Sequence, residues 1–125
     1  MDRAAFRTEF EFTLPKGYID DTGVLHRRGT MRLATAADEI LPLRDPRVQS
    51  NPAYLSIIIL ARVITKLGSV PLIDTQLVES LFASDLEYLR RLYEDINAAE
   101  APEGVPAPAG DAGRLAGGLP VLGEA

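Results

Sequence analysis

Few side chains in this sequence could do chemistry. The 125 residues include one histidine, His26, and no cysteine. Disulfides, thiolate chemistry and zinc fingers are thereby excluded, and any histidine-based catalysis would depend on a single ring. His26 falls on the polar side of an alternating segment, with no nucleophile or orienting group to build a catalytic arrangement. We therefore expect a surface histidine without a function.

The acidic residues form no catalytic or metal-binding pattern. Six of the 18 form three adjacent pairs, and adjacent side chains point in different directions on a helix or strand. The pairs are Asp20–Asp21, Asp38–Glu39 and Glu94–Asp95. Residues 20–23 fall short of a calcium loop, and no glycine-rich phosphate loop occurs. The sequence therefore predicts a protein that is not an enzyme, with no catalytic residue, no metal and no cofactor.

Five arginines lie within 21 residues, a density that could serve phosphate contacts. The whole chain is nevertheless acidic, with 18 Asp and Glu against 13 Lys and Arg and a net charge of -5. Because nucleic-acid binders usually carry a basic domain, we expect no nucleic-acid partner. We expect the arginines to pair with Glu9, Glu11 and Asp38 instead. The arginines are Arg27, Arg28, Arg32, Arg44 and Arg47.

Residues 6–33 contain two alternating runs of apolar and polar side chains. The first run places Phe10, Phe12 and Leu14 on one face, and the second places Met31 and Leu33 on one face. This period of two is typical of half-buried strands. Proline, glycine and aspartate residues separate the runs and favour a turn. We therefore predict an antiparallel β-hairpin over residues 6–33.

Capping and helix-breaking residues divide the middle of the chain into helices. The signals are Ser, Thr, Asp or Asn at the first position, proline in the first turn and glycine after the last turn. The predicted helices cover about residues 36–42, 52–67, 74–83 and 85–98, and residues 44–47 are predicted to form a turn. Their predicted caps are Thr35, Ser50 or Asn51, Asp74, and Ser84, the last in a capping box with Glu87.

The helix predicted over residues 52–67 is apolar on two sides. At about 100 degrees per residue, one stripe runs along the helix and a second stripe lies opposite. Either the helix is sandwiched between the hairpin and the last helices, or the second stripe binds a partner protein. The candidate protein-binding residues are Leu55, Ile58 and Ile59 of this second stripe, with the neighbouring Arg62 and Lys66.

From residue 100 onwards the sequence is rich in Pro, Gly and Ala and has no aromatic side chain. Such a segment buries too little apolar area to offset the entropy of ordering it. We predict a single α+β domain over residues 1–99, mostly helical with an N-terminal antiparallel hairpin, followed by a disordered, flexible tail over residues 100–125. Within the tail, residues 115–122 are either a docking peptide or a few isolated leucines.

No segment has the roughly 20 apolar residues of a transmembrane helix, and the N-terminus lacks the apolar run of a signal peptide. The sequence therefore predicts a cytoplasmic protein without a membrane partner. A homo-oligomer is left open.

Four short segments carry a further pattern. They read Phe-Thr-Leu-Pro-Lys-Gly-Tyr-Ile-Asp-Asp-Thr-Gly-Val-Leu-His-Arg in residues 12–27 and Met-Arg-Leu-Ala-Thr-Ala-Ala-Asp-Glu in residues 31–39. Asp-Pro-Arg-Val-Gln-Ser-Asn-Pro-Ala-Tyr follows in residues 45–54, and Leu-Ala-Arg-Val-Ile-Thr-Lys-Leu-Gly in residues 60–68. In this order they resemble the tail assembly chaperone family of contractile-tailed phages and related contractile injection systems. The resemblance spans about residues 10–97.

The resemblance implies a non-enzymatic protein that binds the long, hydrophobic tape-measure protein, or another tail assembly component, and keeps it from aggregating until the tail tube assembles. It brings no catalytic, metal or binding residue that can be carried over position by position. Two alternatives remain open: a structural subunit of such a particle, in a tube cap or baseplate, and a small unrelated protein-binding adaptor.

Overall fold

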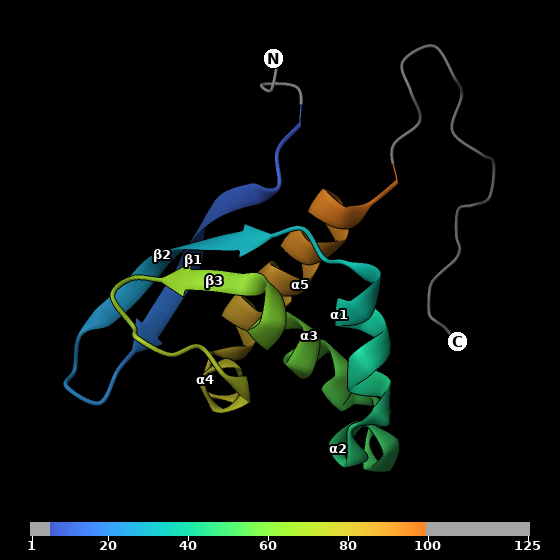
Figure 1. The fold of residues 1–125 in the computed structure, drawn as a ribbon. Coiled ribbons are helices and arrows are strands. Elements are labelled where there is room, and N and C mark those ends of the chain that lie inside the picture. Colours follow the sequence, from blue (N-terminus) through green and yellow to red (C-terminus); the bar gives the residue numbers. More distant parts are fainter. Residues whose placement is uncertain (1–5, 100–125) are drawn as a thin grey trace.

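The computed structural model describes residues 6–99. The chain begins with strands β1 (Glu9–Ile19) and β2 (Leu25–Arg32), which pair antiparallel (Figure 1). The predicted hairpin is therefore confirmed, as is the α+β class. Phe12 and Leu14 are buried on one face, while Glu11 and Thr13 are exposed on the other, as the alternation requires. The predicted tail and its residues 115–122 lie outside the described residues.

The hairpin is irregular in its outer half. Its register shifts between Thr13 and Tyr18, so β1 contains extra residues that β2 does not match. Two backbone N–H groups in this stretch, those of Lys16 and Gly17, donate to the carboxylate of Asp85 at 2.8 and 2.9 Å. Gly17 has φ +108, a backbone conformation that side chains disfavour. The Asp85 carboxylate thus accepts the hydrogen bonds of two N–H groups that have no partner in β2 because of the bulge.

The segment predicted as one helix over residues 52–67 contains three elements. A 3-10 helix (Pro52–Tyr54) leads into α3 (Leu55–Val63), and the chain then becomes strand β3 (Ile64–Leu67), which pairs antiparallel with β2. The prediction of helix up to residue 67 is therefore wrong. The sheet has three strands in the order β1-β2-β3.

A β-bulge explains why this strand looked helical. Ile64 pairs with Met31, but Lys66 pairs with Thr30, so β3 carries one extra residue. The bulge turns both Ile64 and Leu67 into the core, where they are 5% and 2% exposed. Two apolar residues spaced three apart normally indicate a helix, and here the bulge produces the same spacing in a strand.

The other helices start near their predicted caps, with two exceptions. The first segment is α1 (Ala36–Ile40) and a 3-10 helix (Leu41–Arg44), and α4 (Thr75–Glu79) follows Asp74, whose side chain accepts from the Leu77 N–H. The predicted turn at residues 44–47 is wrong in part, because α2 (Pro46–Ser50) begins within it, capped by Asp45. The predicted Ser84–Glu87 capping box is also wrong: α5 (Ala83–Asn97) begins two residues before the predicted start, with Phe82 at the N-cap and without a side-chain cap.

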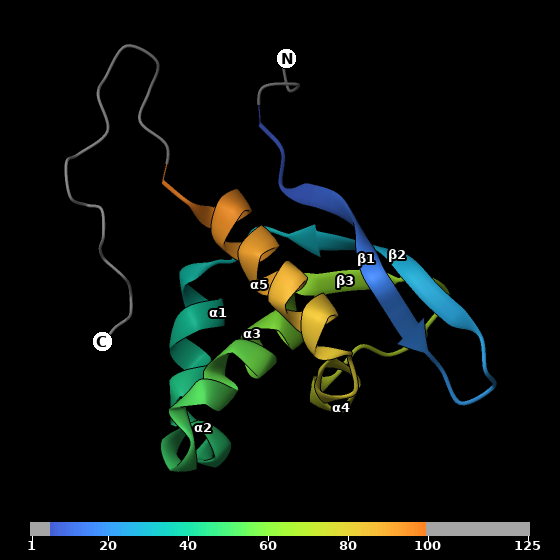
Figure 2. The same cartoon turned by 180° about the vertical axis from the view of Figure 1, so that it is seen from behind.

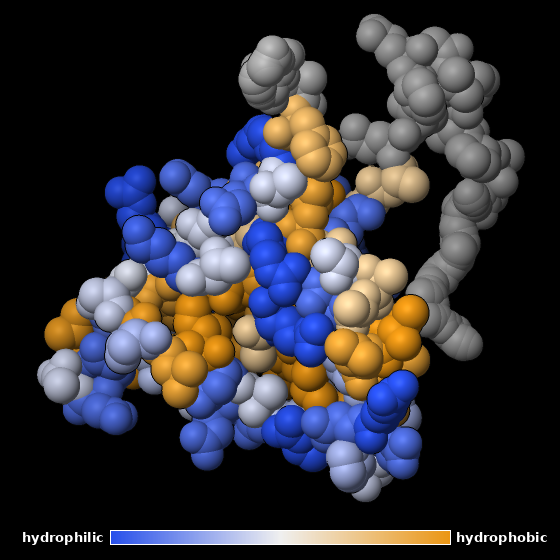
Figure 3. Space-filling model, viewed as in Figure 1, coloured by the Kyte–Doolittle hydropathy of each residue, from blue (hydrophilic) through white to orange (hydrophobic). Residues whose placement is uncertain are grey.

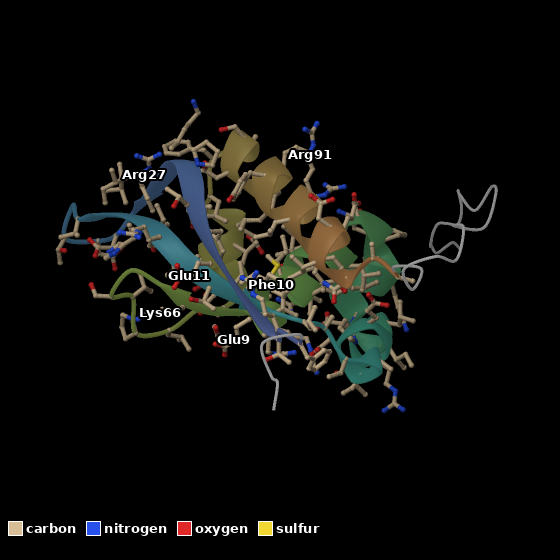
Figure 4. The ribbon with its side chains drawn as sticks, turned by 90° about the horizontal axis from the view of Figure 1, so that it is seen from above. Glu9, Phe10, Glu11, Arg27, Lys66 and Arg91 are labelled. Carbon is tan, nitrogen blue, oxygen red and sulfur yellow. The ribbon has the colours of Figure 1, made fainter. Side chains whose placement is uncertain are left out.

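The helices cover one face of the sheet. In Figures 1 and 2, α5 crosses β1 on this face, α3 and α4 lie beside it, and α1 and α2 lie at the far end of α3. The buried core joins β1, β2 and β3 to α3, α4 and α5. The opposite face of the sheet is open and polar; Figure 4 shows Glu9, Glu11 and Lys66 on this side, away from α5 and Arg91. Within residues 6–99, no helix has the length and apolar character needed to cross a bilayer.

Candidate functional site

The five residues predicted as a protein-binding set do not form an exposed apolar surface. Ile58 and Ile59 are 8% and 9% exposed, and Leu55 is partly buried. α3 contacts α4 and α5, and also α1 and the 3-10 helix after it. Both apolar stripes of α3 are therefore packed inside the domain, as in the sandwiched arrangement. Only Arg62 and Lys66 of the set are exposed.

Arg62 belongs to an ion-pair network centred on Asp38. The Asp38 carboxylate is 2% exposed and lies 2.7 Å from Arg32 Nη1 and 2.9 Å from Arg62 Nε. The backbone N–H of Thr35 also donates to it at 2.7 Å. These contacts, with that of Arg32 the largest, hold the pKa of Asp38 well below its usual range. Of the pairings predicted between the five arginines and Glu9, Glu11 and Asp38, the described residues contain only that of Arg32 with Asp38. With Arg62, it connects β2 to α1 and α3.

His26 is buried, contrary to the prediction of a surface histidine. Its ring is 5% exposed and stacks with Tyr18. Nε2 lies 2.8 Å from Asp20 Oδ2, and the Ser69 N–H donates weakly to Nδ1 at 3.4 Å. The loop after β3 covers the ring, a contact that could not be foreseen because residues 64–67, which lead into this loop beside β2, were predicted to be helical. Since an N–H can only donate, Nδ1 accepts and Nε2 carries the proton.

The position of His26 indicates a structural role. Both ring nitrogens are engaged, one with a carboxylate and one with the backbone, and no described hydroxyl group bonds to the ring. The His26 hydrogen bond is the main cause that lowers the pKa of Asp20, which also accepts from the N–H groups of Thr22 and Val24 in the hairpin turn. The pair therefore fastens this turn to the loop after β3.

The open face of the sheet contains a shallow hollow with mixed charge. It is lined by Glu11, Arg28, Thr30 and Lys66, among others. Glu11 of β1 and Lys66 of β3 lie on either side of Thr30 of β2, and Figure 4 shows both on this side of the sheet. A surface with charges of both signs is well solvated, and this mixture does not favour one class of ligand. Within residues 6–99, no group of three or more His, Asp or Glu side chains is placed to hold a metal ion.

A compact aliphatic patch lies on α1 and the 3-10 helix that follows. Ile40, Leu41 and Leu43 are 58%, 44% and 51% exposed, and we call these three residues the aliphatic patch. Figure 3 shows hydrophobic surface over this part of the molecule, with hydrophilic surface below it. Three large aliphatic side chains exposed within four residues form an apolar surface of the kind that can bind a protein.

Sequence reasoning did not identify this patch. Its residues form an apolar run around Pro42, which could have been noticed. The helix there is only five residues long, however, so its pattern does not reveal which side is covered. The exposure of these residues depends on how α1 and the 3-10 helix lie against α3.

Comparison of the chain with protein-family models, with curated proteins and with solved structures gave no match.

Proposed function

We propose that the protein is a non-enzymatic tail assembly chaperone, acting in the cytoplasm, which binds the tape-measure protein of a phage tail or contractile injection system and keeps it soluble. The resemblance of residues 10–97 to that family supports the proposal. The structural observation that carries it is the aliphatic patch, since a chaperone for a hydrophobic client needs exposed apolar side chains on a stable domain.

The patch is suited to hold a client without unfolding the domain. Its side chains project from short helices whose inner sides are anchored by Pro42 and Val48, both buried. A client segment that covers the patch would remove apolar surface from water, which is favourable in proportion to the area covered. Because the buried core lies elsewhere, in the sheet and α3 to α5, binding would not compete with folding.

Co-expression with the cognate tape-measure protein tests the proposal. The wild-type chain should keep the client in the soluble fraction, and the double variant Ile40→Ser, Leu43→Ser should let it aggregate. The matched control is Phe6→Ser, which removes an apolar side chain that is 74% exposed outside the patch. All three chains should have nearly the same melting temperature. A double variant that still protects the client would show that the patch is not the chaperone surface.

Composition of purified mature particles separates a chaperone from a structural subunit. A chaperone should leave before assembly is complete and be absent from the particles. Mass spectrometry that finds this chain in them at a fixed stoichiometry would contradict the proposal and favour a subunit of the tube cap or baseplate.

A further inference from the structure

A second recessed surface lies between the end of the hairpin and α4. It is a cleft of about 550 Å³, which we call the hairpin cleft. β1, the hairpin turn, the loop after β3 and α4 each contribute to it. Its lining consists of Tyr18, Asp21, Val70, Leu72, Asp74, Gln76, Leu77, Glu79 and Ser80. None of these residues belongs to the aliphatic patch.

The hairpin cleft has a mainly polar surface, with partly buried apolar side chains in its wall and one strongly exposed leucine, Leu72. Leu77 is buried and Tyr18 and Val70 are partly buried, so they form the wall against the core. Leu72 is 67% exposed, the largest value for any large aliphatic side chain in the described part of the chain. Figure 3 shows hydrophobic surface near the hairpin and α4, interspersed with hydrophilic surface.

The charged side chains that line the hairpin cleft are all acidic. They are Asp21, Asp74 and Glu79, and no Lys or Arg is among the lining residues. One carboxylate oxygen of Asp74 accepts a hydrogen bond from the Leu77 N–H at the start of α4, and Glu79 accepts one from the Tyr54 hydroxyl. Asp21 makes no hydrogen bond or ion pair within residues 6–99 and is exposed. Arg47, which donates to the Thr75 hydroxyl of α4, is paired with Asp45.

We propose that the hairpin cleft binds a protein segment in which aliphatic side chains are flanked by Lys or Arg. The aliphatic side chains would contact Leu72 and the partly exposed Val70, and the cations would face Asp21, Asp74 and Glu79. Opposite charge across an interface favours this partner and disfavours nucleic acid or an anionic membrane, both of which carry phosphate. The inference goes beyond the chaperone function, because it concerns a different surface and a partner defined by its charge.

Fluorescence anisotropy with the full-length chain and a labelled synthetic peptide tests the cleft. The probe contains two leucines separated by two alanines and flanked by paired lysines; in the control peptide, glutamates replace the lysines. The lysine peptide should bind and the glutamate peptide should not. Binding should weaken as salt is raised, because the charges involved are exposed to solvent.

Two substitutions locate the binding. Leu72→Ser and Asp21→Lys alter exposed side chains and should keep the melting temperature, yet each should weaken binding of the lysine peptide about tenfold or more. Leu43→Ser is the matched control, because it removes a leucine of similar exposure from the aliphatic patch. It should bind the peptide like the wild type, whatever its effect on a tape-measure client.

Other outcomes overturn the proposal. No binding of the lysine peptide, or equal binding by the Leu72 and Asp21 variants, would show that the cleft is not such a site. A dimer in light scattering that Leu72→Ser dissociates would identify a second copy of the chain as the occupant. Tighter peptide binding after removal of residues 101–125 would identify the chain's own C-terminal segment. None of these results decides the chaperone function, because the co-expression experiment tests the aliphatic patch and not the hairpin cleft.

Discussion

Two aspartates, Asp38 and Asp85, are almost completely buried, and they are satisfied in different ways. Asp38 is surrounded by the cations Arg32 and Arg62, whereas Asp85 receives two backbone N–H groups from β1. A buried carboxylate is costly without partners, because burial removes its hydration. Each aspartate therefore connects elements distant in sequence, and neither lies at the aliphatic patch or in the hairpin cleft.

Replacement of Asp38 tests the first of these networks. Asp38→Asn should lower the free energy of unfolding at pH 7 by about 2 to 3 kcal/mol, because two arginines lose their counter-ion. The folded pKa of Asp38 lies below its unfolded value of about 4. Its stabilisation is therefore complete above about pH 5 and is lost as the pH falls towards the folded pKa.

The difference in free energy of unfolding between wild type and Asp38→Asn should thus shrink as the pH falls from 5 towards 2, because asparagine does not titrate. Urea unfolding of both proteins at several pH values measures this difference in free energy. Asp95→Asn, a change at an exposed aspartate of α5, is the control and should stay within about 0.5 kcal/mol of the wild type. A difference that stays constant down to pH 2 would show that the ion pairs contribute little.

Asp85 and Ser84 offer a direct comparison between neighbouring residues. Asp85→Ala should destabilise the domain by about 2 to 4 kcal/mol, because the N–H groups of Lys16 and Gly17 lose their acceptor. Ser84→Ala should change the free energy of unfolding by less than about 0.5 kcal/mol, since Ser84 does not cap α5. Thermal melts of both variants provide the measurement. A larger destabilisation by Ser84→Ala than by Asp85→Ala would support the capping box that the sequence predicted.

At the level of elements, α3 is the centre of the domain. It contacts α4 and α5 as well as α1 and the 3-10 helix beside it, and the chain runs from it directly into β3. This arrangement explains why α3 is apolar on two sides. A helix with neighbours on opposite sides needs two buried stripes, and neither has to be kept free for a partner.

Ile58→Asp tests the burial of the second stripe. Ile58 is 8% exposed, so a carboxylate there would be buried without a partner and should cost about 3 to 5 kcal/mol. Leu43→Asp, in the aliphatic patch, is the control and should keep the melting temperature within a few degrees because its side chain is exposed. An Ile58→Asp protein with an unchanged melt would mean that the second stripe is accessible after all.

The molecule as a whole has one part that is held by the buried core and a second part, α1, α2 and the 3-10 helix between them, that packs outside it. β1, β2, β3 and α5 share one continuous core with α3 and α4. α1 and α2 are five residues each and, with the 3-10 helix between them, pack at one end of α3 (Figure 2). Helices of this length are held by packing, since their own hydrogen bonds are too few. The aliphatic patch lies on this second part, outside the main core.

Native-state hydrogen exchange should reveal this division. After correction for intrinsic rates, backbone amides of α1 and α2 should exchange at least about tenfold faster than those paired between β1 and β2, because the shorter helices open without disrupting the main core. Amides in the middle of α5 are the control and should exchange as slowly as the hairpin. Equal protection throughout would show that the whole domain opens as one unit.

The sequence by itself determined the elements that depend on neighbouring residues. The alternation of Phe10, Phe12 and Leu14 identified the hairpin, and Thr35 and Asp74 marked the starts of α1 and α4. Strand alternation and N-caps are local rules: a side chain acts on the backbone within a few residues of itself. The apolar stripes of α3 were also visible, but they left open whether a helix or a partner protein covers the second one.

Only the tertiary structure decided which surfaces are covered. The bulge in β3 depends on pairing with Met31 and Thr30 of β2, so the Ile64–Leu67 spacing could not be distinguished from a helix beforehand. His26 is buried because a loop more than forty residues away lies over it. The aliphatic patch and the hairpin cleft are likewise defined by what packs beside them. Exposure is a property of contacts between distant segments, and a local pattern contains no information about those contacts.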